Sequence, residues 1–233
     1  MAAAVASADM QADVRAVLFD WDGTLVDSLG AFQAANGAVM AAFGLPWDEA
    51  IYRRNYAPDW RLMYRRLGVP EDRLDEANEL WHATFARSAD IVAFDGVADA
   101  LARLDAAGLR LGIVTAGDRF IVEPQLDRTG LGRLLTIRVF GDDLAVHKPD
   151  PAPLRRALEL LGLAGRPESV AYVGDAPTDM LMARAVGVRA VGIASVVGDP
   201  DELREAGADD VASTVAAWVE GFVAGLKSDR TAP

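Results

Sequence analysis

Residues 14–24 of the chain read Val-Arg-Ala-Val-Leu-Phe-Asp-Trp-Asp-Gly-Thr. The first six, residues 14–19, form a short apolar run of the kind that builds a buried strand. Two aspartates, Asp20 and Asp22, follow closely, and Gly23 then allows the backbone to turn tightly. A buried strand that carries acidic side chains into a turn is typical of an open α/β sheet, where ligands bind beyond the carboxyl ends of the strands.

Similar apolar runs recur along the chain, and helical periodicity fills most of the gaps between them. Further strands are expected at 109–115, 135–140, 169–173, 189–193 and, more weakly, 209–212. Helices are expected at 97–107, 151–161, 177–186 and 214–226, and glycines just past the first three act as stops. Pro124 is expected to break or restart a helix over 119–129. Strands that alternate with helices predict an α/β fold with a doubly wound parallel sheet.

One long stretch, residues 29–93, interrupts this alternation. It contains no convincing strand, and it is far longer than an ordinary crossover between strands. Its periodicity predicts helices at 30–43, 48–55, 59–67 and 71–87. We therefore expect an inserted α-helical cap domain at 29–93, within an α/β core formed by 14–28 and 94–226. Residues 1–13 and 227–233 are expected to be flexible tails.

The composition excludes several classes of function. None of the 233 residues is cysteine, which rules out disulfides, thiolate metal sites and thiol nucleophiles. The formal net charge is −12, and an acidic surface disfavours binding to nucleic acid or to anionic membranes. No run approaches the roughly 18 consecutive apolar residues of a membrane span, and residues 1–13 lack the basic region of a signal peptide. We expect a cytoplasmic protein that binds neither nucleic acid nor membrane.

Polar side chains follow four successive strands of the predicted sheet. Because the carboxyl ends of parallel strands meet at one edge, these side chains are expected to converge. They are Asp20 and Asp22 after the first strand, Thr115 after the second, Lys148 after the third, and Asp175 and Asp179 after the fourth.

This collection of groups permits a particular chemistry. Clustered carboxylates repel one another unless a hard cation such as Mg²⁺ lies between them. One aspartate can attack phosphorus as a nucleophile, and a carboxylate two residues later can act as general acid and then as general base. Thr115 and Lys148 supply a hydroxyl and a positive charge to the phosphoryl oxygens, and the backbone at Gly23 supplies N–H groups. The pattern predicts magnesium-dependent phosphoryl transfer on a small phosphorylated metabolite.

The run Asp20-Trp21-Asp22-Gly23-Thr24-Leu25-Val26-Asp27-Ser28 resembles the first signature of the haloacid dehalogenase-like hydrolase superfamily. Thr115 resembles its second motif. Lys148, within His-Lys-Pro-Asp-Pro, resembles the third, and the segment from Gly174-Asp175 to Asp179 resembles the fourth. The insertion lies where this family carries helical caps of the C1 type. The overall pattern is similar to phosphoglycolate-phosphatase-like members.

The resemblance implies a role for each matching residue. Asp20 would be the nucleophile and a magnesium ligand, and Asp22 would be the general acid and base, with its backbone carbonyl as a second ligand. Asp175 would be the third protein ligand, and Asp179 would act behind it, through water or through Lys148. The substrate would be bound by Gly23, Thr24, Thr115, Ala116 and Lys148.

Two details of the motifs bear on the reaction. Dehalogenases of the family lack an acid at the position of Asp22, because a departing halide needs no proton. The presence of Asp22 therefore favours phosphoryl transfer over cleavage of a carbon–halogen bond. Many relatives have asparagine after the second-motif hydroxyl, whereas this chain has Ala116-Gly117. A backbone N–H remains at that position, but a side-chain contact to the substrate is lost.

Other interpretations remain open at this point. The same site would serve a phosphomutase of the β-phosphoglucomutase type, and a catalytically silent binding protein could share the fold. Asp179 could merely complement a helix dipole, and Lys148 could be a solvated loop residue. The remaining candidates are expected to be solvated or structural: Asp142, Asp143, His82 and His147.

The predicted cap contains one basic, aromatic-rich stretch, residues 52–66. In one interpretation it recognises the rest of an anionic substrate, and in another it binds nucleic acid. In the third, which we favour for most of its residues, aromatic side chains pack inside amphipathic helices and the arginines are solvated. Its arginines are Arg53, Arg54, Arg61, Arg65 and Arg66.

Overall fold

The computed structural model describes residues 14–57, 59–85 and 91–229. The tail expected at 1–13 lies outside these ranges. The chain divides into two compact units, each described here by itself. The core comprises the residues up to Leu25 and those from Ala93 onward, and the insertion is Val26–Val92. Among the residues that the structure describes, every helix is too short or too polar to span a bilayer.

The core is built on a six-stranded sheet with the order β5-β4-β1-β6-β7-β8, and every adjacent pair of strands is parallel. Its central strand is the apolar run near the start of the chain, which is buried along its whole length. Strands covered on both faces have no solvated side, which explains why they read as continuous apolar runs. The strands are β1 (Ala16–Phe19), β4 (Arg110–Val114), β5 (Leu135–Val139), β6 (Val170–Gly174), β7 (Arg189–Ile193) and β8 (Asp210–Ala212).

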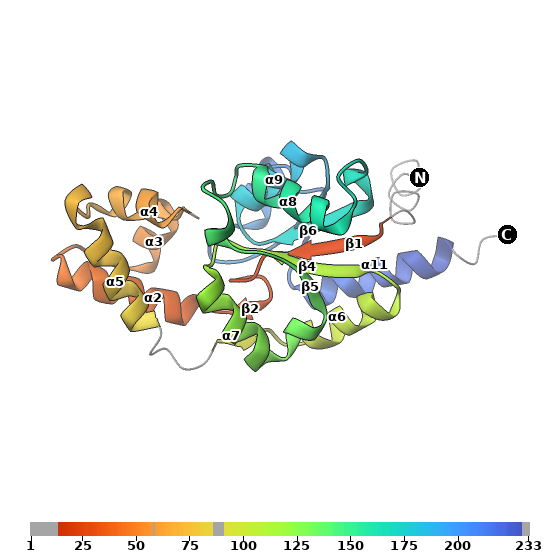
Figure 1. Ribbon diagram of the computed structural model, residues 1–233, viewed down its shortest axis with the longest axis horizontal. Helices are drawn as coiled ribbons and strands as arrows, with labels where there is room; N and C mark the ends of the chain where they lie inside the picture. The colour runs from red at the N-terminus through yellow and green to blue at the C-terminus, as the bar shows by residue number, and fades with distance from the viewer. Residues whose placement is uncertain (1–13, 58, 86–90, 230–233) are drawn as a thin grey trace. The chain divides into compact units, whose positions relative to one another are not determined.

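Helices cover both faces of this sheet, as Figure 1 shows. Helices α8 (Ala152–Leu161) and α9 (Pro177–Val186) pack together on one face, whereas α6 (Val97–Ala106) and α11 (Val215–Asp229) pack together on the other. A short helix, α10 (Pro200–Glu205), contacts α9, β7 and β8. This arrangement confirms the predicted doubly wound α/β fold.

The order of the strands defines where a ligand is expected. From β1 the chain builds outward through β4 and β5, and it then returns to the other side of β1 to build β6, β7 and β8. The direction of winding therefore reverses between β1 and β6. In open α/β sheets, ligands bind outside the carboxyl ends of the strands at this kind of switch point.

The prediction at Pro124 is wrong. Helix α7 (Arg119–Thr129) runs through this proline without a break. Proline removes one N–H donor from the helix, but the side chains of Val122, Gln125 and Leu126 are buried against the core. Tertiary packing of this face therefore outweighs the lost hydrogen bond.

The end of α11 also differs from the prediction. The helix continues to Asp229, three residues into the segment expected to be a tail, and residues 230–233 lie outside the described ranges. No proline follows the expected end of the helix until Pro233, so nothing in the local sequence stops it at 226.

The insertion is helical, as predicted. Helix α2 packs on α5, and Phe32 of α2 lies 5.5 Å from Trp81 and 5.1 Å from Phe85 between ring centroids. Asp48 and Asp59 cap the amino ends of α3 and α4 through backbone N–H groups. Its helices are α2 (Leu29–Ala42), α3 (Glu49–Asn55), α4 (Trp60–Leu67), the 3₁₀ turn η1 (Glu71–Arg73) and α5 (Leu74–Phe85).

Two very short strands that the sequence did not predict pair with each other at the ends of the insertion. They are β2 (Val26–Asp27) and β3 (Val92–Ala93). Just inside the core, the Phe94 N–H donates to the Leu25 carbonyl at 3.0 Å. Two residues are too few for an alternating pattern, so the sequence carries no signal for either strand.

Candidate active site

Trp21 anchors the segment that follows β1. Its indole is fully buried, and its Nε1–H donates to Gln125 Oε1 on α7 at 2.6 Å. The hydrogen bond fixes the residue that lies between Asp20 and Asp22, so the backbone carrying these two carboxylates has little freedom. The sequence analysis missed Gln125, because it lies in a helix more than one hundred residues away.

Gly23 is required by the geometry of this turn. Its φ angle is +76°, a region that favours glycine, and a Cβ at this position would collide with Asp175 Oδ2. The close approach also shows that the turn after β1 packs against the carboxylate at the end of β6, and the sequence predicted that these two strand ends meet at one edge of the sheet.

Lys148 lies at the centre of the site. Its Nζ is 2.5 Å from Asp20 Oδ1 and 2.8 Å from Asp179 Oδ1, and its side chain is only 5% exposed. Lys148 is therefore a buried ion-pair partner of two carboxylates, and the interpretation as a solvated loop lysine is wrong. The loop from β5 thus delivers one cation to carboxylates that β1 and α9 position.

Asp179 is held by several partners at once. Its Oδ1 contacts Lys148 and accepts from the Tyr172 hydroxyl at 3.0 Å, and its Oδ2 accepts from the Ala176 N–H at 3.0 Å. A Cβ at Gly174 would collide with this carboxylate. Asp179 therefore does more than complement the dipole of α9, since its side chain is 2% exposed and makes specific contacts.

Asp175 lies at the end of β6 and contacts groups from two other loops. The Thr24 hydroxyl points at Asp175 Oδ1 from 3.5 Å, and the Ser195 hydroxyl points at the Asp175 carbonyl from 3.3 Å. A Cβ at Gly198 would collide with the same carbonyl. The loop after β7 therefore packs closely on Asp175. A search of strand ends that included β7 would have found Ser195.

Three of the predicted carboxylates can share a metal ion. Asp20, Asp175 and Asp179 each offer a buried oxygen, and these oxygens lie within 4.8 Å of one another. Hard divalent cations prefer carboxylate oxygens, and a cation would offset the repulsion between these groups. The donor set therefore fits a hard divalent metal ion.

Thr115 and Asp22 both lie close to Gly117. Thr115 Oγ1 accepts from the Gly117 N–H at 2.9 Å, which leaves the hydroxyl proton available for an oxygen of a ligand. A Cβ at Gly117 would be 3.3 Å from Thr115 Oγ1 and 3.5 Å from Asp22 Oδ2. A Cβ at Gly141 would collide with the Ala116 carbonyl. The segment from Thr115 to Gly117 is thus packed tightly against its neighbours.

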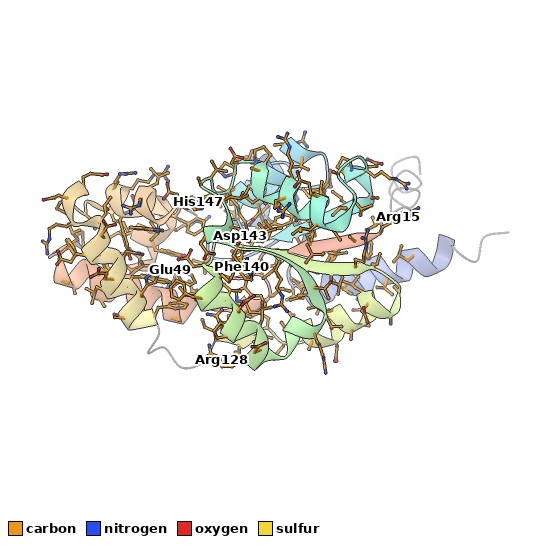
Figure 2. The ribbon with its side chains drawn as sticks, viewed as in Figure 1. Arg15, Glu49, Arg128, Phe140, Asp143 and His147 are labelled. Carbon is orange, nitrogen blue, oxygen red and sulfur yellow. The ribbon has the colours of Figure 1, made fainter. Side chains whose placement is uncertain are left out.

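Asp142 and Asp143 fix the loop that follows β5, although the sequence suggested simple solvation. Asp142 Oδ1 accepts from the Arg119 N–H at 2.9 Å, and Asp143 Oδ1 accepts from the Arg119 guanidinium at 2.6 Å. The same guanidinium lies 4.2 Å from the centre of the Phe140 ring. Figure 2 shows Phe140, Asp143 and His147 at the end of the core opposite Arg15.

Burial and neighbouring charges shift the pKa values of three side chains in the site. Burial raises the pKa of Asp20 to about 7, with Asp179 adding to the rise and Lys148 opposing it. Burial also raises the pKa of Asp175 well above its usual value, and Asp20 and Asp179 add repulsion. Burial alone would lower the pKa of Lys148, but Asp179 and Asp20 raise it, so the ammonium stays charged.

The raised pKa of Asp20 predicts an unusual pH dependence of stability in metal-free protein. The folded protein takes up a proton near pH 7, whereas an unfolded aspartate stays charged down to about pH 4. Between these values the folded state binds more protons, so it gains stability as the pH falls and loses it as the pH rises. In EDTA we expect Tm to be ~5 °C or more higher at about pH 5 than at about pH 8.

Asp20→Asn is the matched control for this measurement, because it keeps the shape and removes the titrating group. The variant should show a smaller change of Tm over the same range. A Tm that falls steadily in EDTA from pH 8 to 5 would contradict the prediction.

Comparison with known proteins places the chain in a family. The model for haloacid dehalogenase-like hydrolases matches residues 17–193. Phosphoglycolate phosphatase 1 of Pseudomonas aeruginosa is 34% identical over 185 residues, which cover 75% of this chain and 67% of that protein. The phosphoglycolate phosphatase of Rhodospirillum rubrum is 36% identical over 190 residues, covering 76% of this chain and 78% of that protein.

The fold is similar to solved structures as well. A hydrolase from Pseudomonas syringae superposes with a TM-score of 0.79 at 25% identity, covering 94% of this chain and 100% of that one. The stretch matched by the family model begins within β1 and ends with β7, so it includes every residue of the predicted site. The chain belongs to the haloacid dehalogenase-like hydrolase family.

Proposed function

We propose that this protein is a magnesium-dependent phosphomonoesterase that hydrolyses a small phosphorylated metabolite through an aspartyl-phosphate on Asp20. One observation carries the proposal. The buried Lys148 ammonium bridges Asp20 and Asp179 at the switch point of the sheet, where Asp175 adds a third carboxylate. Relatives named phosphoglycolate phosphatase support the same class of reaction.

Asp20 and Asp175 would hold Mg²⁺ with their carboxylates, and Asp22 would contribute its backbone carbonyl. Asp179 would act through water, because Lys148, Tyr172 and Ala176 already contact its oxygens. When bound, the ion would offset the charge of the phosphoryl oxygens and of the surrounding carboxylates.

In the first step, one oxygen of Asp20 attacks phosphorus and the bond from phosphorus to the leaving oxygen breaks. Lys148 already contacts Asp20 Oδ1, so the other oxygen of this carboxylate is the one that attacks. Asp22 gives a proton to the departing oxygen, which leaves as an alcohol. The Thr115 hydroxyl and the Lys148 ammonium bind the non-bridging oxygens, where negative charge gathers.

In the second step, water attacks the phosphorus of the aspartyl-phosphate. Asp22, now a carboxylate, takes a proton from that water. The bond between phosphorus and the Asp20 oxygen breaks, which releases inorganic phosphate and restores the carboxylate. Asp22 keeps the proton that the next leaving group requires.

A screen of phosphorylated metabolites for released inorganic phosphate tests this proposal. The panel should include phosphoglycolate, sugar phosphates and nucleoside monophosphates, with Mg²⁺ present. We expect release from at least one of them. A phosphomutase would instead return the phosphoryl group to the sugar, so an isomeric sugar phosphate without free phosphate would favour that alternative. Neither product from any compound would contradict both functions.

Specificity for the rest of the substrate is proposed to come from the insertion, because the core residues described above recognise only the phosphoryl group. Most of its arginines are already engaged within the insertion. Arg61 pairs with Asp75, Arg65 pairs with Glu71, Arg66 donates to the Tyr56 carbonyl, and Arg53 also has an interaction partner. Arg54, on the last turn of α3, has no hydrogen-bond or ion-pair partner among the residues described in the structure.

Arg54→Ala is therefore expected to reduce kcat/KM about tenfold for a substrate with a second anionic group, such as phosphoglycolate. This loss corresponds to ~1.4 kcal/mol of transition-state binding. An aryl phosphate has no second anion, so its kcat/KM should hardly change. Arg65→Ala is the matched control, because Arg65 already pairs with Glu71. Equal losses on both substrates, or no loss on either, would contradict a recognition role for Arg54.

A further inference from the structure

Tyr172 places a polar hydroxyl in the otherwise apolar strand that ends at the active site. Strand β6 reads Val-Ala-Tyr-Val-Gly, and every residue in it is buried. Tyr172 is 0% exposed, so its hydroxyl has no access to water and needs a partner inside the protein. An apolar residue of similar size would fill the same space without this requirement.

The Tyr172 hydroxyl meets two acceptors. It lies 2.9 Å from the Val114 carbonyl, just before Thr115, and 3.0 Å from Asp179 Oδ1. A hydroxyl has one proton, so the two acceptors compete for it, and a charged carboxylate accepts more strongly than a neutral carbonyl. The ring also lies beneath the site, with its centroid 5.5 Å from Lys148 Nζ.

Lys148 makes the position of Asp179 critical during the reaction. Before the reaction, the ammonium contacts both Asp20 and Asp179. Once Asp20 carries the phosphoryl group it no longer has a free carboxylate charge, so Asp179 remains as the carboxylate that holds Lys148 while the ammonium binds the phosphoryl oxygens. A lysine side chain has four rotatable bonds, and without a fixed partner its ammonium would be poorly placed.

Two donors restrain Asp179 besides Lys148. The Ala176 N–H binds Oδ2, and Tyr172 binds Oδ1, the same oxygen that contacts the lysine. Without the Tyr172 hydroxyl, only the lysine would hold Oδ1, and the carboxylate would be freer to rotate. Tyr172 thus restrains Asp179, and Asp179 holds Lys148. Lys148 in turn binds the phosphoryl group in the proposed reaction.

We infer that Tyr172 is a positioning residue that sets Lys148 through Asp179 while the phosphoryl group is transferred. The inference rests on the proposed phosphatase function. It goes beyond that function by giving a role to a residue that need not contact the substrate. The alternative is that Tyr172 only fills the core and satisfies its hydroxyl with the Val114 carbonyl.

Tyr172→Phe separates these possibilities, because it removes the hydroxyl and keeps the ring. We expect kcat for phosphate release to fall about tenfold, with a smaller change in KM, since the lost contact acts mainly in the transition state. Tyr64→Phe is the matched control: Tyr64 is 1% exposed, and its hydroxyl donates to Asn36 Oδ1 at 3.1 Å within the insertion. It should lower Tm to a similar extent and leave kcat nearly unchanged.

A double-mutant cycle tests whether Tyr172 acts through Asp179. In the Asp179→Asn background, Tyr172→Phe should lower kcat less than twofold, because the carboxylate that it restrains is gone. Additive losses would mean an independent effect and would overturn the inference. If Tyr172→Phe does not fold, Tyr172→Met serves in its place, since it also lacks the hydroxyl and fills the space with a flexible apolar chain.

Binding of inorganic phosphate provides a second readout that needs no turnover. Millimolar phosphate with Mg²⁺ should raise Tm of the wild type more than that of Tyr172→Phe, because Lys148 binds the anion. If the wild type binds phosphate but hydrolyses nothing, the proposed phosphatase function fails. The difference in Tm shift between the wild type and Tyr172→Phe then decides by itself whether Tyr172 positions Lys148. Equal shifts of Tm, or wild-type protein that does not bind phosphate, would overturn it.

Discussion

Asp20→Asn is expected to reduce phosphate release by several orders of magnitude. The substitution keeps the size of the side chain and removes the charge that attacks phosphorus. Asp20 is 7% exposed and contacts Lys148, so the amide will occupy nearly the same place without acting as a nucleophile. Single-turnover release at saturating substrate measures the loss in the chemical step itself.

Three comparisons make this result specific. Asp105→Asn, on the exposed side of α6, should leave turnover unchanged. In EDTA near neutral pH, Asp20→Asn should melt no lower than the wild type, because it removes a buried charge. Asp22→Ala should slow poor leaving groups far more than good ones, because a stable leaving group needs no proton. Near-normal turnover by Asp20→Asn would contradict the mechanism through an aspartyl-phosphate.

Removal of divalent metal should abolish activity, and added Mg²⁺ should restore it. The buried oxygens of Asp20, Asp175 and Asp179 lie within 4.8 Å of one another, and one lysine cannot balance three carboxylates. Without a cation, a phosphate dianion entering this cluster meets net negative charge. Activity after treatment with EDTA, and after titration back with MgCl₂, measures the effect.

Asp175→Asn is the informative variant for this experiment. It should raise the Mg²⁺ concentration needed for half-maximal activity, because one charged ligand is lost. Tyr64→Phe, with its change confined to the insertion, should leave that concentration unchanged. Full activity after exhaustive chelation would contradict metal dependence altogether.

The sheet and its polar edge could be predicted from the sequence because both depend on short-range patterns. A strand buried on both faces must be continuously apolar, and the first polar residues after it must lie at its carboxyl end. Asp20, Thr115 and Asp175 were found in this way, and the parallel register of β1 with β4 and β6 brings the ends of these strands together. Lys148 was also found after a strand, but a lysine beside Pro149 gives no local sign of burial, so only the other motifs favoured a role for it in the site.

The supporting residues could not be predicted, because their roles depend on contacts between distant segments. Tyr172 reads as one more bulky residue of a buried strand, and only the fold brings its hydroxyl to Asp179. Gln125 reads as a polar helix residue, although it is 2% exposed and accepts from the indole N–H of Trp21. At Pro124 the local rule was outweighed by burial of one face of the helix.

The paired ends of the insertion affect how the sequence of this chain can evolve. Leu25 and Phe94 are joined by a backbone hydrogen bond, and β2 pairs with β3 next to them. These contacts hold the two ends of the insertion together, so the insertion is a long loop closed at its base. The entropic cost of closing a loop grows only slowly with its length. Segments of different size and specificity can replace one another at this junction while the hydrolytic machinery is inherited intact.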